Sequence, residues 1–191
     1  PVPLVDPTKI DVRRWASAPL LDRNVEPPSR AALVVDVTSD RRWASIGVAG
    51  EVDGKTVVLC HTGKGMEWIV PKVVELTQAR DIAQVALTTG QAKALQPELV
   101  TAGVDFVKLS APEMGAACAA FQEAINAATV VHVGQPELDA AVARARTRFT
   151  GQSEQWDRDR ELGGHNDSPL VAVSGAFYQW GLQDAPMPAI Y

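Results

Sequence analysis

The chain has 191 residues, of which 46% are hydrophobic and 21% charged, a composition that excludes disorder over most of its length. Its 18 Lys and Arg residues against 23 Asp and Glu residues give a net charge of −5, so any contact with nucleic acid must be local rather than driven by overall charge. No segment approaches the ~18 apolar residues of a membrane span, and no secretory leader opens the chain, so no membrane contact is expected. Cys60 and Cys118 lie in apolar segments and are predicted to be buried, reduced thiols.

The first 30 residues differ from the rest of the chain in composition. The sequence starts at Pro1 without a methionine, and six of its 13 prolines fall within the first 28 residues. No sustained periodicity accompanies them. We therefore expect residues 1–30 to be a connector from a preceding domain, and residues 31–191 to form a single domain.

From residue 31 the hydrophobic pattern becomes regular. Three β-branched or alternating runs, the last two joined by Asp53-Gly54, predict an antiparallel meander at 31–37, 43–52 and 55–61. Further strands are predicted at 82–87 and 104–109. Helical spacing, with a capping box at Ser110 and Glu113, predicts helices at 68–80, 91–102, 110–125, 138–149 and 169–182.

This order of elements defines a fold class. Each strand-helix-strand unit must cross over right-handed to stay in one sheet, so the later strands should extend the meander in parallel. The sequence predicts an α/β fold with a mixed sheet of about five or more strands and helices on both faces.

Asp36 is the first candidate for chemistry, because it interrupts an otherwise apolar strand. A buried carboxylate costs several kcal/mol unless it is paired or binds a cation. One reading is an acid at the end of a strand that bonds to the polar turn at 38–42. The favoured reading is a metal ligand.

Asp167 and Asp40 are further acidic candidates. Asp167 follows two glycines and precedes Ser168-Pro169, a cap and first-turn signal, so it is either a charge favoured by a helix N-terminus or a metal ligand that backbone can approach closely. Asp40 lies in the turn after Asp36 and is either a solvated turn residue or an outer metal ligand.

A polar segment before residue 163 carries candidate DNA-binding side chains. Trp156, Arg158 and Arg160 alternate with acidic residues, so on a strand they would share one face. Guanidinium groups could bind phosphates there while the indole packs on a sugar or base. The alternative is an edge hairpin with cross-strand ion pairs.

Several other chemistries lack support. The three histidines have no Cys or Glu at zinc-ligand spacing, so no zinc site is predicted. Gly63-Lys64-Gly65 lacks the frame of a phosphate-binding loop, and Val173-Ser174-Gly175 is not a nucleophile elbow.

Together these segments resemble the nuclease domain of phage terminase large subunits, particularly those of phages that infect actinobacteria. The segment 36–46 is similar to that group's first-strand motif, and 167–172 to its terminal motif. Intervening segments fall in the same order, at 90–92, 116–118 and 135–138. The resemblance covers roughly residues 15–182.

The resemblance implies a ribonuclease H-like endonuclease that cuts concatemeric double-stranded viral DNA in the cytoplasm of the infected host. It implies Asp36 and Asp167 as catalytic residues that hold Mg²⁺ or Mn²⁺, with two ions expected. It also implies an ATPase domain in the same full-length chain, together with a small terminase subunit and a portal as partners.

One position departs from this family. The resemblance implies a second acidic residue at the end of the fourth strand, where this chain has Thr88 and Thr89. A neutral hydroxyl is a poorer Mg²⁺ ligand than a carboxylate, so Thr88 is a weak candidate ligand at the place of the missing acid. Two alternatives therefore remain: a DNA-clamping or assembly domain that cuts poorly, and another ribonuclease H-like nuclease such as a junction resolvase.

Overall fold

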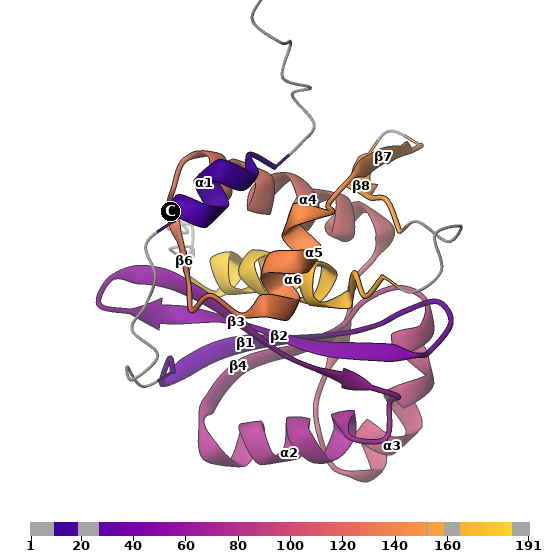
Figure 1. Cartoon of the computed structure of the whole chain (residues 1–191). Helices are drawn as coiled ribbons and strands as arrows, with labels where there is room; N and C mark the ends of the chain where they lie inside the picture. Colours follow the sequence, from indigo (N-terminus) through magenta and orange to yellow (C-terminus); the bar gives the residue numbers. More distant parts are fainter. Residues whose placement is uncertain (1–9, 19–26, 152, 159–164, 185–191) are drawn as a thin grey trace, which may run out of the picture.

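The computed structural model describes residues 10–18, 27–151, 153–158 and 165–184 (Figure 1). A six-stranded mixed sheet forms its centre, in the order β5-β4-β1-β2-β3-β6. β1 (Arg30–Val37), β2 (Trp43–Val52) and β3 (Lys55–Lys64) are the antiparallel meander. β4 (Asp81–Leu87) pairs in parallel with β1, and β5 (Val107–Lys108) pairs in parallel with β4. β6 (Val130–His132) adds a parallel strand beside β3.

Helices cover both faces of this sheet, as Figure 1 shows. One face carries α2 (Ile69–Ala79), the 3-10 helix η1 (Gln91–Leu95) and α3 (Gln96–Thr101). The other carries α4 (Ala111–Asn126), α5 (Pro136–Ala143) and α6 (Ser168–Asp184). A small antiparallel hairpin of β7 (Thr147–Thr150) and β8 (Ser153–Trp156) lies against α4.

The two faces of β1 supply two separate hydrophobic cores. Ala31, Leu33 and Val35 belong to the cluster under α2 and α3, whereas Ala32 and Val34 belong to the cluster under α4 and α6. Successive strand residues point to opposite faces, so a strand covered on both sides is apolar at nearly every position. This confirms the expected fold class and the reason for the apolar run.

Three predicted elements differ from those observed. The helix expected at 91–102 begins as a 3-10 turn, and the strand expected at 104–109 contains only Val107 and Lys108. The segment predicted as a helix at 138–149 ends at Ala143, and Phe149 lies on β7 with 71% of its surface exposed. The helical spacing of the apolar residues in this segment was therefore coincidental, because they belong to two different elements.

The described part of the N-terminal segment packs on the helical layer. α1 (Val12–Ser17) is capped by Asp11, and its Trp15 is 2% exposed. The Trp15 ring stacks on His132 with centroids 3.9 Å apart, and its indole nitrogen donates to Asp139 at 2.8 Å. Trp15 belongs to the same hydrophobic core as residues that follow position 30. This packing gives no support to a domain boundary at residue 30, which stays a prediction.

The remaining sequence expectations concern thiols and membranes. Cys60 and Cys118 are both buried and unpaired, as predicted, and burial raises the pKa of each thiol to about 12. Within the described residues, no helix is both long enough and apolar enough to cross a membrane.

Candidate active site

Asp36 lies at the carboxyl end of β1 and is fully buried. It follows Ala32 and Val34 on the face of the sheet covered by α6, because strand alternation places every second residue there. The Thr88 hydroxyl, directly after the parallel strand β4, donates a 2.5 Å hydrogen bond to Asp36 Oδ1. The end of β4 therefore adjoins the acid, with a neutral side chain where the resemblance implied a carboxylate.

Arg158 joins Asp36 to Asp167. Its Nη2 donates to Asp36 Oδ2, and its Nε and Nη2 donate to Asp167 Oδ2 and Oδ1 at 3.0 and 3.4 Å. Arg158 Nη2 thus donates to both acids. The two oxygens that it contacts lie at most roughly 7 Å apart, which is twice the length of the longest hydrogen bond. Two metal–oxygen bonds of ~2.1 Å span at most ~4.2 Å, so a single divalent ion would bridge the acids in the place that the Arg158 guanidinium occupies, with the carboxylates drawn together.

Burial and charge act in opposite directions on the three groups. Burial raises the pKa of Asp36 to about 6, although Arg158 and the Thr88 hydrogen bond lower it and Asp167 adds a repulsion. Burial also disfavours the charge on Arg158, but Asp36 and Asp167 outweigh that effect and raise the pKa of its guanidinium. The two acids therefore face one permanent cation.

A cluster of polar side chains fixes the backbone beside Asp167. The Ser45 hydroxyl, at 0% exposure on β2, lies 2.7 Å from the Ser168 hydroxyl and donates to Thr62 at 2.9 Å. Asn166 donates to Thr62 at 3.0 Å and accepts from the Ser168 backbone N–H at 3.2 Å. The expected helix start is confirmed, but Asn166, rather than Ser168, supplies the side-chain cap.

Gly47 permits the close approach of α6 to the sheet. A Cβ atom at this position of β2 would lie 2.3 Å from the carbonyl carbon and oxygen of Ala172. Real Cβ atoms do not approach backbone so closely, so any side chain would push α6 outward. Because Asp167 directly precedes α6, this contact sets its distance from Asp36.

Asp40 serves the turn after β1. Its Oδ1 accepts from the Thr38 hydroxyl at 2.7 Å and from the Arg42 backbone N–H at 3.0 Å. The Thr38 hydrogen bond, followed by the Arg42 contact, lowers the pKa of this exposed carboxyl. These contacts match the turn-residue alternative and give no support to an outer-ligand role.

The structure contradicts the predicted DNA contact of Trp156 and places Arg158 away from an exposed ribbon. Trp156 ends β8 with 7% exposure, and its indole nitrogen donates to Ser174 at 2.9 Å, so its ring is a core element and cannot stack on a base. Arg158 follows the strand and faces the two acids instead of lying on an exposed ribbon. Its side chain is only 25% exposed. Arg160 lies outside the described residues.

A divalent cation fits the acid pair. Carboxylate oxygens are hard ligands of the kind Mg²⁺ and Mn²⁺ prefer, and the two groups already converge on a positive charge. No cluster of three or more His, Cys, Asp or Glu side chains suited to a metal occurs among the described residues. The pair therefore suits one ion, while the two-ion site stays a prediction.

The fold is similar to that of solved phage proteins. The large terminase of bacteriophage HK97 superimposes with a TM-score of 0.71 at 13% identity, over 89% of this chain and 43% of that protein. The large terminase nuclease from thermophilic phage G20c gives a TM-score of 0.70 at 14% identity, over 90% of this chain and 99% of that one. The G20c nuclease with bound magnesium gives 0.65 at 13% identity, over 90% and 97% of the two chains.

These likenesses identify the fold. No family model and no curated protein sequence matches the chain. The structure nevertheless has the α/β fold of phage large-terminase nuclease domains, as expected. The chain spans less than half of the HK97 large terminase and nearly all of the isolated G20c nuclease.

Sequence reasoning missed the partner of the acids and the support beneath Asp167. Nothing in the sequence near Arg158 indicates that its side chain points inward. One of its partners, Asp36, is far away in the chain, and the other, Asp167, follows two glycines. Ser45 and Thr62 carried a weak signal: hydroxyl side chains at successive strands opposite a predicted helix start.

Proposed function

We propose that this chain is the nuclease domain of a phage large terminase and that it hydrolyses phosphodiester bonds of concatemeric double-stranded DNA. The observation that carries the proposal is that Asp36 and Asp167 both contact one cationic group, the Arg158 guanidinium. The fold likeness adds support, because the G20c nuclease has been solved with magnesium and with cobalt bound.

In this proposal Asp36 and Asp167 hold Mg²⁺ or Mn²⁺ between β1 and the start of α6. A bound divalent ion supplies Lewis-acid stabilisation of the phosphate and activates water. The acids must be ionised for this role, so Arg158 and Thr88 favour the competent form of Asp36 by lowering its pKa against the effect of burial. Arg158 also provides a guanidinium fork that can bind a phosphate oxygen once it leaves a carboxylate.

The proposed setting follows from the same likeness. A large terminase of thermophilic bacteriophage D6E was solved in complex with ATP-γ-S, and the chain matches 44% of that protein at 8% identity. We propose an ATPase domain in the same full-length chain, with a small terminase subunit, a portal and DNA as partners in the cytoplasm of the bacterial host.

Cleavage of a supercoiled plasmid with Mg²⁺ or Mn²⁺ tests the function. Asp36→Asn and Asp167→Asn should each lose nicking, whereas Asp81→Asn should retain it. Asp81 is a matched control because it is a paired acid at the start of β4, at the opposite end of the strands. Metal-dependent cleavage that survives both active-site changes would contradict the proposal.

A DNA-clamping domain with weak cleavage is a second candidate. The neutral Thr88 beside Asp36 favours it, because a second ion would lack a third carboxylate there. Tight plasmid binding without nicking in either metal would support the clamp. Preferential cutting of four-way junctions over linear duplex would support a resolvase instead.

A further inference from the structure

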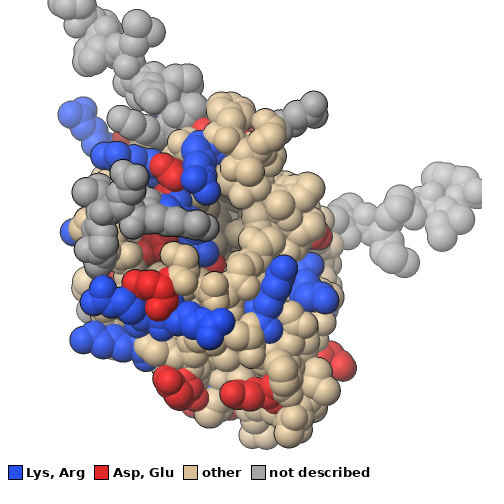
Figure 2. All heavy atoms as spheres, turned by 90° about the vertical axis from the view of Figure 1, so that its right-hand side faces the viewer, with Lys and Arg blue, Asp and Glu red and all other residues tan. Residues whose placement is uncertain are grey.

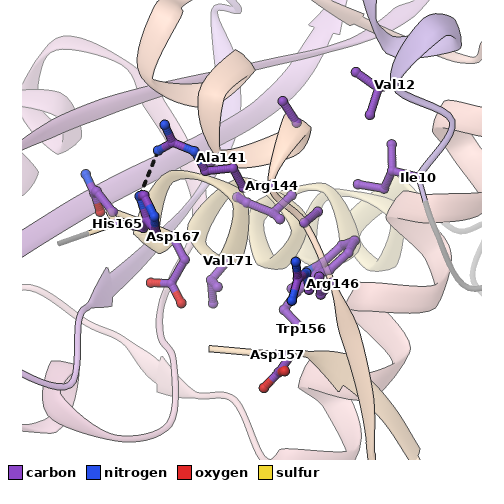
Figure 3. A pocket seen from close by; sticks show the side chains of 14 residues that line it. Ile10, Val12, Ala141, Arg144, Arg146, Trp156, Asp157, His165, Asp167 and Val171 are labelled. Carbon is purple, nitrogen blue, oxygen red and sulfur yellow. Dashed lines mark hydrogen bonds between the residues drawn. The ribbon is translucent and has the colours of Figure 1, made fainter. Parts of the chain in front are cut away.

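A pocket of about 440 Å³ opens beside Asp167 (Figure 3). Asp167 lines it toward one end, and Ile10 and Val12 lie toward the other. Its remaining walls come from the end of α5, the segment that follows α5, and the first turn of α6. Asp36 and Arg158 are not part of its lining, so Asp167 is the member of the candidate active site that the pocket adjoins.

Two arginines give this pocket an excess of positive charge. Arg144 and Arg146 both line it, and Arg144 Nη1 lies 3.0 Å from His165 Nδ1. The Arg146 side chain forms no hydrogen bond or ion pair with another described residue. The acids in the lining are paired, since Asp157 contacts Arg148 at 3.5 Å and Asp167 shares Arg158 with Asp36. Counted with these partners, four arginines face three acids, so one positive charge remains in excess.

This charge is local in a chain whose net charge is −5. Figure 2 shows Lys and Arg side chains, interspersed with Asp and Glu, on the face that lies to the right in Figure 1. Two guanidinium groups with few partners, on one rim, are the arrangement that binds a phosphate by charge-assisted hydrogen bonds.

The floor of the pocket is apolar. Leu170 and Val171 from α6 lie beneath it, each less than 5% exposed, and Ala141 adds a small side chain from α5. A smooth aliphatic floor under a cationic rim suits a deoxyribose and a base edge attached to a phosphate. An inorganic anion would leave this floor uncovered.

We propose that this pocket holds the DNA nucleotide next to the bond that is cut, with its phosphate bound by Arg144 and Arg146. The inference rests on the proposed nuclease function, because the acid pair defines where the cut phosphate lies. His165 positions Arg144 through their hydrogen bond. Arg144 and Arg146 are therefore strand-positioning residues.

Binding of a labelled 20-base-pair duplex in EDTA, measured at several salt concentrations, tests the pocket without cleavage. Arg144→Ala with Arg146→Ala should weaken binding at least ~10-fold and lower the salt slope by about 1, the value expected for the loss of one phosphate contact. Arg30→Ala is the control, because Arg30 is also exposed but lies at the other end of β1. It should leave affinity and slope unchanged.

A second variant tests the space of the pocket without changing charge. Ala143 is exposed and lines the pocket, so Ala143→Trp should fill the space while the core stays intact. Duplex binding should weaken while the salt slope stays at the wild-type value. Thermal melting of each variant verifies the fold.

The outcomes separate this inference from the proposed function. Wild-type affinity and slope in the double arginine variant would overturn the pocket assignment, even if cleavage still depends on Asp36. Equal losses in the Arg30→Ala control would also overturn it, since the effect would then reflect overall charge. Loss of binding in the double variant supports the pocket even if plasmid cleavage is absent from the wild-type chain.

Discussion

Replacing Arg158 with Gln should strengthen divalent-metal binding in the isolated chain. Arg158 contacts the same oxygens of Asp36 and Asp167 that a metal ion would use, so the guanidinium and the ion compete. Gln keeps most of the side-chain length but removes the charge.

The size of the effect follows from two opposing quantities. At ~4 Å and an effective dielectric constant of ~20, one pair of unit charges is worth about 4 kcal/mol. Desolvation of the guanidinium and the acids cancels much of that attraction. A net gain of about 1.4 to 3 kcal/mol is expected, which corresponds to roughly 10- to 100-fold tighter metal binding.

Isothermal titration of EDTA-stripped protein with Mn²⁺ measures this difference. Arg144→Gln is the matched control, because Arg144 lies in the pocket beside Asp167 but does not contact either carboxylate in the described contacts. It should change affinity much less than Arg158→Gln. Without metal, Arg158→Gln should also melt at a lower temperature, since it leaves buried Asp36 without its cation, and saturating Mn²⁺ should restore most of the loss.

Equal or weaker Mn²⁺ binding in Arg158→Gln would refute the competition. The guanidinium would then act together with the metal instead of occupying its place. A shift in Arg144→Gln as large as in Arg158→Gln would also refute it, because the effect would be one of general charge.

Four further predictions concern the same site. Gly47→Ala should destabilise the fold by about 2 to 4 kcal/mol in urea denaturation, because its Cβ would collide with the Ala172 backbone, and a loss under ~0.5 kcal/mol would contradict the observed packing of α6. Mn²⁺ affinity should fall about 10-fold per pH unit below about 6 and level off above it, because a proton on Asp36 competes with the ion; constant affinity from pH 5 to 7 would contradict the raised pKa. In EDTA the same raised pKa makes protonated Asp36 stabilising at low pH, a contribution lost as pH rises from about 4 through about 6 and absent from Asp36→Asn. Thr88→Asp should lower the melting temperature without metal and tighten Mn²⁺ binding about 10-fold, because it adds a carboxylate beside Asp36; unchanged Mn²⁺ binding would place the end of β4 outside the metal site.

Much of the fold was predictable because local signals and global packing agree. The alternating and β-branched runs of the meander gave β1, β2 and β3, and the Ser110 capping box gave the start of α4. β6 was not predicted, since three residues are too few for a period to emerge. Its pairing with β3 depends on the chain returning across α4, which is a tertiary contact.

The site was predictable only where burial itself was informative. A carboxylate inside an apolar strand revealed Asp36, and glycines before a helix start revealed Asp167. The role of Arg158 depends on where the chain goes after β8, and alternation alone predicted a continued strand there. The burial of Trp156 was missed for the same reason, because a period of two cannot tell the inner face of a hairpin from the outer one.

The position of α6 on Gly47 has a consequence for when the chain can act. Asp36 is synthesised early, whereas Asp167 is placed only after the last described helix has docked on β2. A nascent or truncated chain that lacks α6 contains both acids but has no docked helix to hold Asp167 beside Asp36. For the proposed nuclease, assembly of the acid pair therefore depends on α6, so partly made copies that lack this helix should not cleave DNA.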